Sequence, residues 1–335
     1  MNKRLDIIDF ARGFAIFTIV AMHLAFNLSP SGLAAKALSF GGAGVHIFFL
    51  CSGFGLYLSH LGNPLDYLSF LRRRFLKVYL PYLLAVVLWT FFLLLHSHAF
   101  SLRVVSSHLL LYKMFNADLD ISLCYHYWFI STIVQFYLCW PLIVKLMKWK
   151  YGLAGAVVIS LSWAALVGLL GLEESRPWGS FFLQYLWEFC LGMHLATKTN
   201  SIEQAILDIP WWALCLTAGV CMTATGLMGA YGGPLKLFND GPSMFGYAAC
   251  VLLVYKAGFH WLKSFFEFTS TISYEWYLLH GLVILATQAC LPCFSPFFHV
   301  ALSLVTSYGV AFLLSCLIGR HRSLLANTCQ REKAR

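Results

Sequence analysis

The stretch that decides the fold is Asp9-Phe10-Ala11-Arg12-Gly13-Phe14-Ala15-Ile16-Phe17-Thr18-Ile19-Val20-Ala21-Met22-His23. It is apolar enough to cross a lipid bilayer, yet it contains an acid, an arginine and a histidine. Ionisable groups inside a membrane span are costly and usually face a protein interior or a water-filled cavity. Each of the three is therefore a candidate functional group.

The spacing of these three groups sharpens the hypothesis. Arg12 and His23 are eleven residues apart, which on an ideal α-helix is three turns plus about 20° and a rise of about 16 Å. They therefore share one helix face at different depths. Asp9 precedes Arg12 by three residues, a separation at which an acid and a base meet. Alternatively, Asp9 and Arg12 lie at the headgroups, where Arg12 extends to the interface, and His23 bonds a neighbouring helix.

The composition indicates a membrane protein. Of 335 residues, 60% are hydrophobic and 11% charged, with a mean hydropathy of +0.73, so the apolar surface cannot be hidden in one soluble core. We expect an all-α polytopic protein with about ten transmembrane helices in one bundle. Each predicted span is near the twenty residues that a crossing helix needs: 7–28, 41–60, 77–97, 124–146, 150–172, 178–198, 210–230, 241–258, 268–290 and 297–319.

The basic residues predict the orientation. The formal charge is +9, but the lysines and arginines cluster at the ends of apolar segments rather than on one polar domain, so no nucleic-acid partner is expected. Seventeen of the 23 fall in predicted cytoplasmic segments, five on the opposite face and Arg12 inside a span. The positive-inside rule then places both termini in the cytoplasm. We expect a transmembrane domain over residues 1–320, a basic cytoplasmic tail over 321–335, and a short amphipathic helix at the outer interface within 98–123.

Two segments in the first half of the chain carry candidate binding residues. Ser52 and Gly53 lie near the middle of the second span, where they can bring a hydroxyl and bare backbone against a ligand; helix packing through small residues is the alternative. His46 lies in the outer third of the same span, as a ligand contact or as a hydrogen-bonding group between helices.

A basic cluster lies just before the third span. It places four positive charges at the cytoplasmic end of that span: Arg72, Arg73, Arg74 and Lys77. Such clusters bind anionic lipid headgroups, and arginine also suits the phosphates of a ligand that arrives from the cytoplasm.

Other polar groups in apolar segments have open roles. Trp128 and Tyr137 fit an interfacial aromatic belt or a surface for stacking sugar rings. Glu188, Glu275 and His280 are again ionisable groups in lipid, and the sequence does not assign their roles. The pair His96 and His98 lacks neighbouring cysteine or carboxylate ligands, so no metal site is expected.

Together these segments resemble the acyltransferase-3 family of integral membrane O-acyltransferases, in its short, single-domain form. The similar motifs occur in the family's order in residues 8–13 with His23, 44–54, 72–81, 127–141 and 272–280. The resemblance implies transfer of an acyl group, usually acetyl, from cytoplasmic acetyl-CoA to a hydroxyl of a glycan or lipid-linked sugar at the far side of the inner membrane. It implies no metal.

The resemblance also implies roles for individual residues. Arg12 and His23 match an arginine-ten-residues-histidine motif whose histidine is the proposed catalytic residue. Arg74 and Lys77 fall where family members carry an Arg-x-x-Arg pair thought to meet CoA, with lysine in place of the second arginine. Ser52 begins a matching Ser-Gly-Phe motif.

The chain departs from the family pattern at two places. Many members carry an acid at the position of His46 and a glutamate in the segment that here spans 131–135, so a mechanism that needs carboxylates there is in doubt. We also expect no fused extracytoplasmic domain of the kind that longer members carry. The transfer would therefore be completed within the bundle itself.

We therefore hypothesise that the acyl donor and the acceptor hydroxyl react at His23. The phosphates of acetyl-CoA contact the basic cluster, and His23 accepts the proton of the acceptor hydroxyl, by direct transfer or through an acyl-enzyme. Arg12 orients the cavity or stabilises charge, Asp9 holds Arg12, and His46, Trp128 and Tyr137 line the acceptor route. Two other classes stay open: a transporter or carrier of a lipid-linked sugar or anion, whose buried ions form a translocation path, and an inactive partner protein. Membrane lipids are expected partners, and the oligomeric state is not predicted.

Overall fold

A computed structural model describes residues 5–29, 31–96, 101–119 and 124–333. The regular structure in these ranges is helical, with no strand, as the sequence predicts. The α-helices are α1 (Asp6–Phe26), α2 (Gly32–Ser39), α3 (Gly44–Gly62), α4 (Tyr67–Arg74), α5 (Leu80–His96), α6 (Leu102–Leu109), α7 (Trp128–Leu138), α8 (Trp140–Lys148), α9 (Gly152–Leu169), α10 (Arg176–Gly179), α11 (Leu186–Ala196), α12 (Thr199–Asp208), α13 (Trp211–Tyr231), α14 (Asp240–Lys256), α15 (His260–Thr271), α16 (Ser273–Cys290) and α17 (Pro296–Lys333). Shorter turns are η1 (Phe40–Ala43), η2 (Phe75–Tyr79), η3 (Lys113–Phe115), η4 (Ala117–Leu119), η5 (Tyr125–Tyr127) and η6 (Gly233–Phe238).

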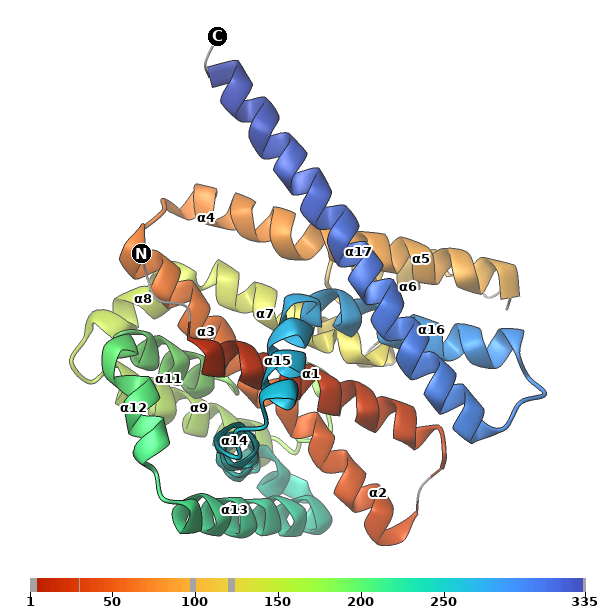
Figure 1. Cartoon of the computed structure of the whole chain (residues 1–335). Coiled ribbons are helices and arrows are strands. Elements are labelled where there is room, and N and C mark those ends of the chain that lie inside the picture. The colour runs from red at the N-terminus through yellow and green to blue at the C-terminus, as the bar shows by residue number, and fades with distance from the viewer. Residues whose placement is uncertain (1–4, 30, 97–100, 120–123, 334–335) are drawn as a thin grey trace.

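Helix α1 lies in the middle of the bundle and carries the stretch from Asp9 to His23 (Figure 1). It contacts α3, α14, α15, α16 and α17. One close approach is to α15, because a Cβ added at Gly13 would lie 1.8 Å from the carbonyl oxygen of Phe266. The apolar side chains Ile16 and Val20 are fully buried on α1. Asp9, Arg12 and His23 are half-buried in this packing, whereas Asp6 at the start of the helix is exposed.

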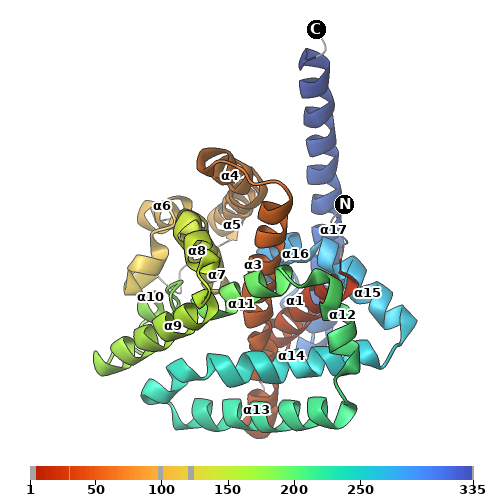
Figure 2. The ribbon, with the colours of Figure 1, turned by 90° about the vertical axis from the view of Figure 1, so that its left-hand side faces the viewer.

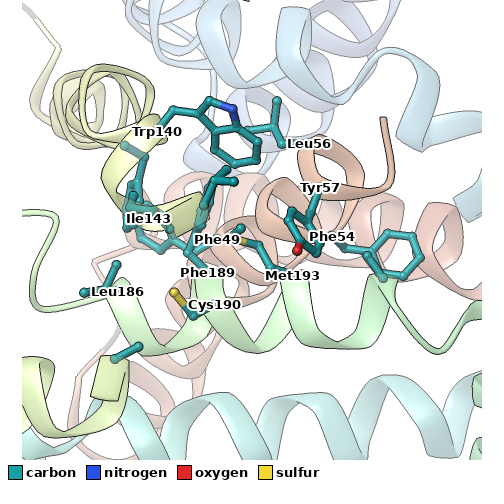
Figure 3. Packing of buried hydrophobic residues seen from close by; sticks show 14 of the residues in the cluster. Phe49, Phe54, Leu56, Tyr57, Trp140, Ile143, Leu186, Phe189, Cys190 and Met193 are labelled. Carbon is teal, nitrogen blue, oxygen red and sulfur yellow. The ribbon is translucent and has the colours of Figure 1, made fainter. Parts of the chain in front are cut away.

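Helices α3 and α11 cross in direct backbone contact, which two glycines permit. A Cβ added at Gly53 would lie 2.0 Å from the carbonyl oxygen of Phe189, and one at Gly192 would lie 1.9 Å from that of Leu50. Phe49, Phe189 and Met193 fill the space beside the crossing (Figure 3). Gly53 thus acts through helix packing, the alternative that the sequence left open, and small residues serve this purpose in membrane bundles.

Judged by length and hydropathy, fewer than ten helices in the described ranges can cross a membrane. Every predicted range contains helix, but only six described helices are long and apolar enough to cross. A seventh arises if α7 and α8, bent by 62° at Cys139, form one span. The predicted span 178–198 contains the eleven-residue helix α11, which is too short to cross alone. The chain is a helical membrane protein, and the count of ten stays a prediction.

The basic cluster belongs to a continuous helix rather than to a loop. Helix runs from Tyr67 to His96 over 30 residues, and the π-helical turn η2 lies inside it. Such turns are rare and often mark functional sites. Here the turn contains Lys77 and follows directly after Arg74.

The outer parts of the bundle are less buried. Helices α13 and α14 pack on each other at one side (Figures 1 and 2). Helix α6 lies within the segment where the sequence predicts a short helix, although its place at a membrane interface is not tested. Helix α17 runs unbroken past the predicted domain boundary at residue 320, and its C-terminal end projects away from the other helices (Figure 1).

Candidate active site

A cavity of about 710 Å³ lies beside α1 and collects many of the predicted site residues. We call it the central cavity. Its lining includes six of them: Asp9, Arg12, Ser52, Arg74, Lys77 and Tyr137. These side chains come from α1, α3, α4, η2 and α7. Residues that are up to 128 positions apart in the chain thus share one chamber.

The junction of α15 and α16 supplies the polar part of the wall around Asp9. Ser270 donates a hydrogen bond to Asp9 Oδ1 at 3.4 Å, and Ser273 donates to the carbonyl oxygen of Ser270 at 2.8 Å. The Tyr274 hydroxyl donates to the carbonyl of Val78, at 2.6 Å. All of these groups belong to residues that line the cavity. The hydrogen bonds therefore tie the start of α16 both to α1 and to the helix of the basic cluster.

The four predicted cations divide into two pairs. Arg74 and Lys77 line the central cavity, whereas Arg72 and Arg73 are exposed and lie outside its lining. The Arg74 guanidinium lies 5.7 Å from the centroid of the Phe70 ring. Its Nε is buried and finds no hydrogen-bond acceptor in the described part of the chain. Arg74 thus retains donor capacity that an anionic ligand can use.

His23 lies in a cluster of three histidines, which we call the histidine cluster: His23, His126 and His280. His23 Nδ1 is 2.8 Å from His280 Nε2, and the centroid of the His126 ring is 4.3 Å from that of His280. His126 and His280 are buried, and His23 is half-buried. The ring of His23 therefore faces other protein groups rather than lipid alone.

Tyr277 holds the histidine cluster together. Its carbonyl oxygen accepts from His280 Nδ1 at 2.8 Å and from His126 Nε2 at 3.1 Å, and its hydroxyl donates to the carbonyl of His126. The close approach needs a glycine, because a Cβ added at Gly281 would lie 2.8 Å from His126 Cε1. In the sequence, His126 is marked only by its place at the start of an aromatic stretch.

The central cavity extends to the wall that carries the histidine cluster. Ile19, which precedes His23 by one helical turn, lines the cavity. Tyr277, which contacts the other two histidines, also lines it. His23 itself is not among the lining residues. The cavity therefore joins Arg74 and Lys77 to the immediate neighbours of His23.

His46 and Trp128 lie outside the central cavity, in a second polar cluster. Their rings lie about Tyr185, with centroids 6.0 Å and 5.9 Å from its ring. His46 Nδ1 is 2.8 Å from Glu188 Oε1, and His46 Nε2 is 3.9 Å from Asp240 Oδ1. Glu188 thus has a partner, which answers one role that the sequence left open. Acids are present around His46, although residue 46 is not itself an acid.

The structure offers no ready metal site among its described residues. No group of three or more histidines, cysteines and acids is arranged to hold an ion in those ranges. His96 is exposed on the last turn of α5 and its Nδ1 is 3.1 Å from the carbonyl of Phe92, while Ser97 and His98 lie outside the described residues.

Comparison with known proteins identifies a family. A family model described as an acyltransferase domain matches residues 5–318, nearly the whole chain. No curated protein matches the chain, and no solved structure does.

Proposed function

Because the chain belongs to the acyltransferase-3 family of membrane O-acyltransferases, we propose that it moves an acetyl group from cytoplasmic acetyl-CoA to a hydroxyl at the outer side of the inner membrane. The acceptor is a cell-surface glycan or a lipid-linked sugar. The observation that carries the proposal is the central cavity, whose lining includes the cations Arg12, Arg74 and Lys77 as well as Ile19 and Tyr277, the neighbours of the histidine cluster.

The donor fits the charged end of this cavity. CoA is a polyphosphate on an extended arm, and arginine binds phosphate oxygens through paired, charge-assisted hydrogen bonds. Arg74 and Lys77 are placed for the phosphates inside the cavity, and the exposed Arg72 and Arg73 are placed for phosphates or lipid headgroups at its entrance. A volume of 710 Å³ lies within the range of about 300–1,000 Å³ typical of small-molecule sites.

Arg12 contacts a part of the donor that lies away from the reacting thioester. It precedes His23 by about 16 Å along α1, too far for one carbonyl group to touch both residues. We therefore assign Arg12 to hold the donor's arm within the cavity. Asp9, one turn earlier and bonded to Ser270, supports the position of Arg12.

His23 acts as the general base. As the acceptor oxygen attacks the thioester carbon, its proton passes to His23; the new C–O bond forms, the C–S bond breaks, and the leaving thiolate takes the proton from His23. A positioned base of this kind contributes about 10²–10⁴ in rate. The same residue serves if an acyl-enzyme forms first.

The acceptor reaches His23 from the outer end of α1. Tyr137 lines the cavity with the donor groups, so we assign it to the donor's path. His46 and Trp128 lie about Tyr185 in the second polar cluster, and any contact they make with the acceptor lies outside the central cavity.

The test is the mass of the surface glycan and of lipid-linked sugars in cells that lack the gene and carry plasmid copies. Wild type restores one acetyl per acceptor unit, whereas His23→Ala and Arg12→Ala do not, at equal amounts of protein in the membrane. His260→Ala, on an exposed histidine, is the matched control and restores acetylation. Unchanged acetylation with His23→Ala contradicts the proposal, and substrate movement without dependence on CoA favours a transporter.

A further inference from the structure

Backbone carbonyl groups of α16 determine which ring nitrogen of His280 carries a hydrogen. His280 Nδ1 faces two backbone carbonyl oxygens of the preceding turn of α16, that of Tyr277 at 2.8 Å and that of Trp276 at 3.1 Å. A carbonyl oxygen can only accept a hydrogen bond, so Nδ1 must carry the hydrogen. In a neutral imidazole the other nitrogen, Nε2, is then an acceptor.

This acceptor is directed at His23. His23 Nδ1 lies 2.8 Å from His280 Nε2, and the two rings are nearly parallel, at 9°, with centroids 5.0 Å apart. This separation is what a contact between ring edges gives, so the hydrogen bond lies close to the ring planes. The Nδ1 of His23 must therefore donate. Its single hydrogen is at Nδ1, and Nε2 has the free lone pair.

We propose that His280 is a positioning residue that selects the Nδ1–H tautomer of His23 and so makes Nε2 the basic nitrogen. The inference deepens the proposed function and rests on it for the role of His23. A histidine free in water favours the opposite tautomer, with hydrogen on Nε2. Without His280, the nitrogen on the side of the ring away from α16 would carry a hydrogen and could not accept a proton.

The surroundings keep His280 in this arrangement. Its side chain has no exposed surface, so water does not compete for Nε2. The His126 ring lies across it and donates from Nε2 to the same Tyr277 carbonyl at 3.1 Å. Nearby, the buried Lys113 ammonium donates to the carbonyl of Cys124 at 2.9 Å. A positive charge already buried in this region favours neutral imidazoles beside it.

The same contact serves the reaction. When His23 Nε2 takes the proton of the attacking alcohol, the ring becomes positive, and its Nδ1–H bond to His280 becomes charge-assisted and stronger. When the proton leaves with the thiolate, the starting tautomer is restored. His280 exchanges no proton with the substrates in this cycle.

Nitrogen NMR of the full-length protein in lipid bilayers, with ¹⁵N-labelled histidine, tests the tautomer directly. The signals of His23 are identified by their loss in His23→Gln. We expect a protonated Nδ1 and an unprotonated Nε2 in the wild type, and a shift towards Nε2–H in His280→Phe. His108→Phe, on another fully buried histidine, is the matched control and leaves the His23 signals unchanged. An Nε2–H form in the wild type, or no change in His280→Phe, overturns the proposal.

Kinetics separates positioning from a structural role. His280→Phe should lower kcat by about 100-fold or more with little change in KM for acyl-CoA, because Arg74 and Lys77 lie at the other end of the cavity. His280→Gln, whose amide oxygen can accept from His23, should restore part of kcat. Equal loss in both variants, or a loss confined to KM, contradicts the proposal. The NMR measurement needs no turnover, so the two proposals can fail separately. If His23 has the expected tautomer but the protein transfers no acyl group, only the proposed function is refuted. If the protein transfers acyl groups but His23 carries its hydrogen on Nε2, only this inference is refuted.

Discussion

Replacing Gly53 with alanine tests the crossing of α3 and α11, on which the position of Ser52 in the central cavity depends. The added Cβ would lie 2.0 Å from the carbonyl oxygen of Phe189. The position of each atom is determined by helical backbone, so neither can rotate away. Cβ atoms essentially never lie closer than 3.0 Å to another heavy atom, and ordinary contact begins at 3.4 Å, so the two helices must separate by at least 1 Å. The aromatic packing beside the crossing is then lost in part. Overpacking of this kind costs about 1–3 kcal/mol, and we expect Gly53→Ala near the upper end.

The matched control is Gly55→Ala on the same helix. No atom lies within 4 Å of a Cβ added at Gly55, and alanine is favoured over glycine within a helix by roughly 0.5–1 kcal/mol. The assay is unfolding of the purified protein in detergent, followed by circular dichroism at increasing denaturant. Gly53→Ala should unfold earlier than wild type, and Gly55→Ala at the same point or later. A Gly53→Ala protein as stable as Gly55→Ala would refute the argument that backbone contact joins the two helices.

Three further changes have defined outcomes. Arg74→Met should raise KM for acyl-CoA by about 10-fold, the worth of one charge-assisted hydrogen bond of about 1.5 kcal/mol. Lys145→Met, on an exposed cation outside the cavity lining, should leave that KM unchanged, and equal effects in a titration of transfer rate against donor would count against the donor site. Glu188→Ala removes the acid that is hydrogen-bonded to the buried His46 imidazole and should cost about 1–3 kcal/mol of unfolding free energy. Glu188→Gln should lose less in the same denaturant assay, and equal stability of the two variants would contradict this. Gly281→Ala displaces the His126 ring and should lower kcat by about 10-fold or more, since small misplacements at a reacting centre are costly. A wild-type kcat would show that the close approach of Gly281 to His126 is not needed for activity.

Much of the fold is visible in the sequence because hydrophobic length determines where helices form in a membrane protein. Every predicted span contains helix, and the positions of α1, α3 and α9 agree with the predicted ranges within a few residues. The breaks were harder to predict. Pro141 lacks a backbone N–H and disfavours helix in the residue before it, which marks the bend after Cys139, but the angle of 62° depends on packing against other helices. The short α11 begins only after a turn that the hydropathy average conceals.

The sequence identified the charged residues of the candidate site, because charged side chains in or beside an apolar span are unusual. Asp9 and Arg12 are costly inside a span, and Arg74 and Lys77 belong to a dense positive cluster at the end of one. The structure places all four around one cavity. It does not bring His46 or Trp128 there, because which neighbour a helix face meets is decided by long-range packing. The same limit hid the contact between His23 and His280, which are 257 residues apart.

The second polar cluster illustrates what a single sequence conceals. Glu188 looks like an isolated acid in an apolar helix, and His46 like an isolated base in another. Their contact at 2.8 Å exists only because α3 and α11 cross at Gly53 and Gly192. The positions of these two glycines therefore determine which polar side chains meet, and the composition of the two helices does not show this.

In the proposed function, an acyl donor from the cytoplasmic face and an alcohol from the other face react at His23. The most direct measurement uses sealed vesicles with the cytoplasmic face outward, radiolabelled acetyl-CoA outside, and counting of label covalently bound to lipid-linked sugar and glycan. Wild-type protein should transfer label, and His23→Gln should transfer no more than vesicles without the protein. Transfer by His23→Gln at the wild-type rate, or transfer that requires the donor on the opposite face, would contradict the account.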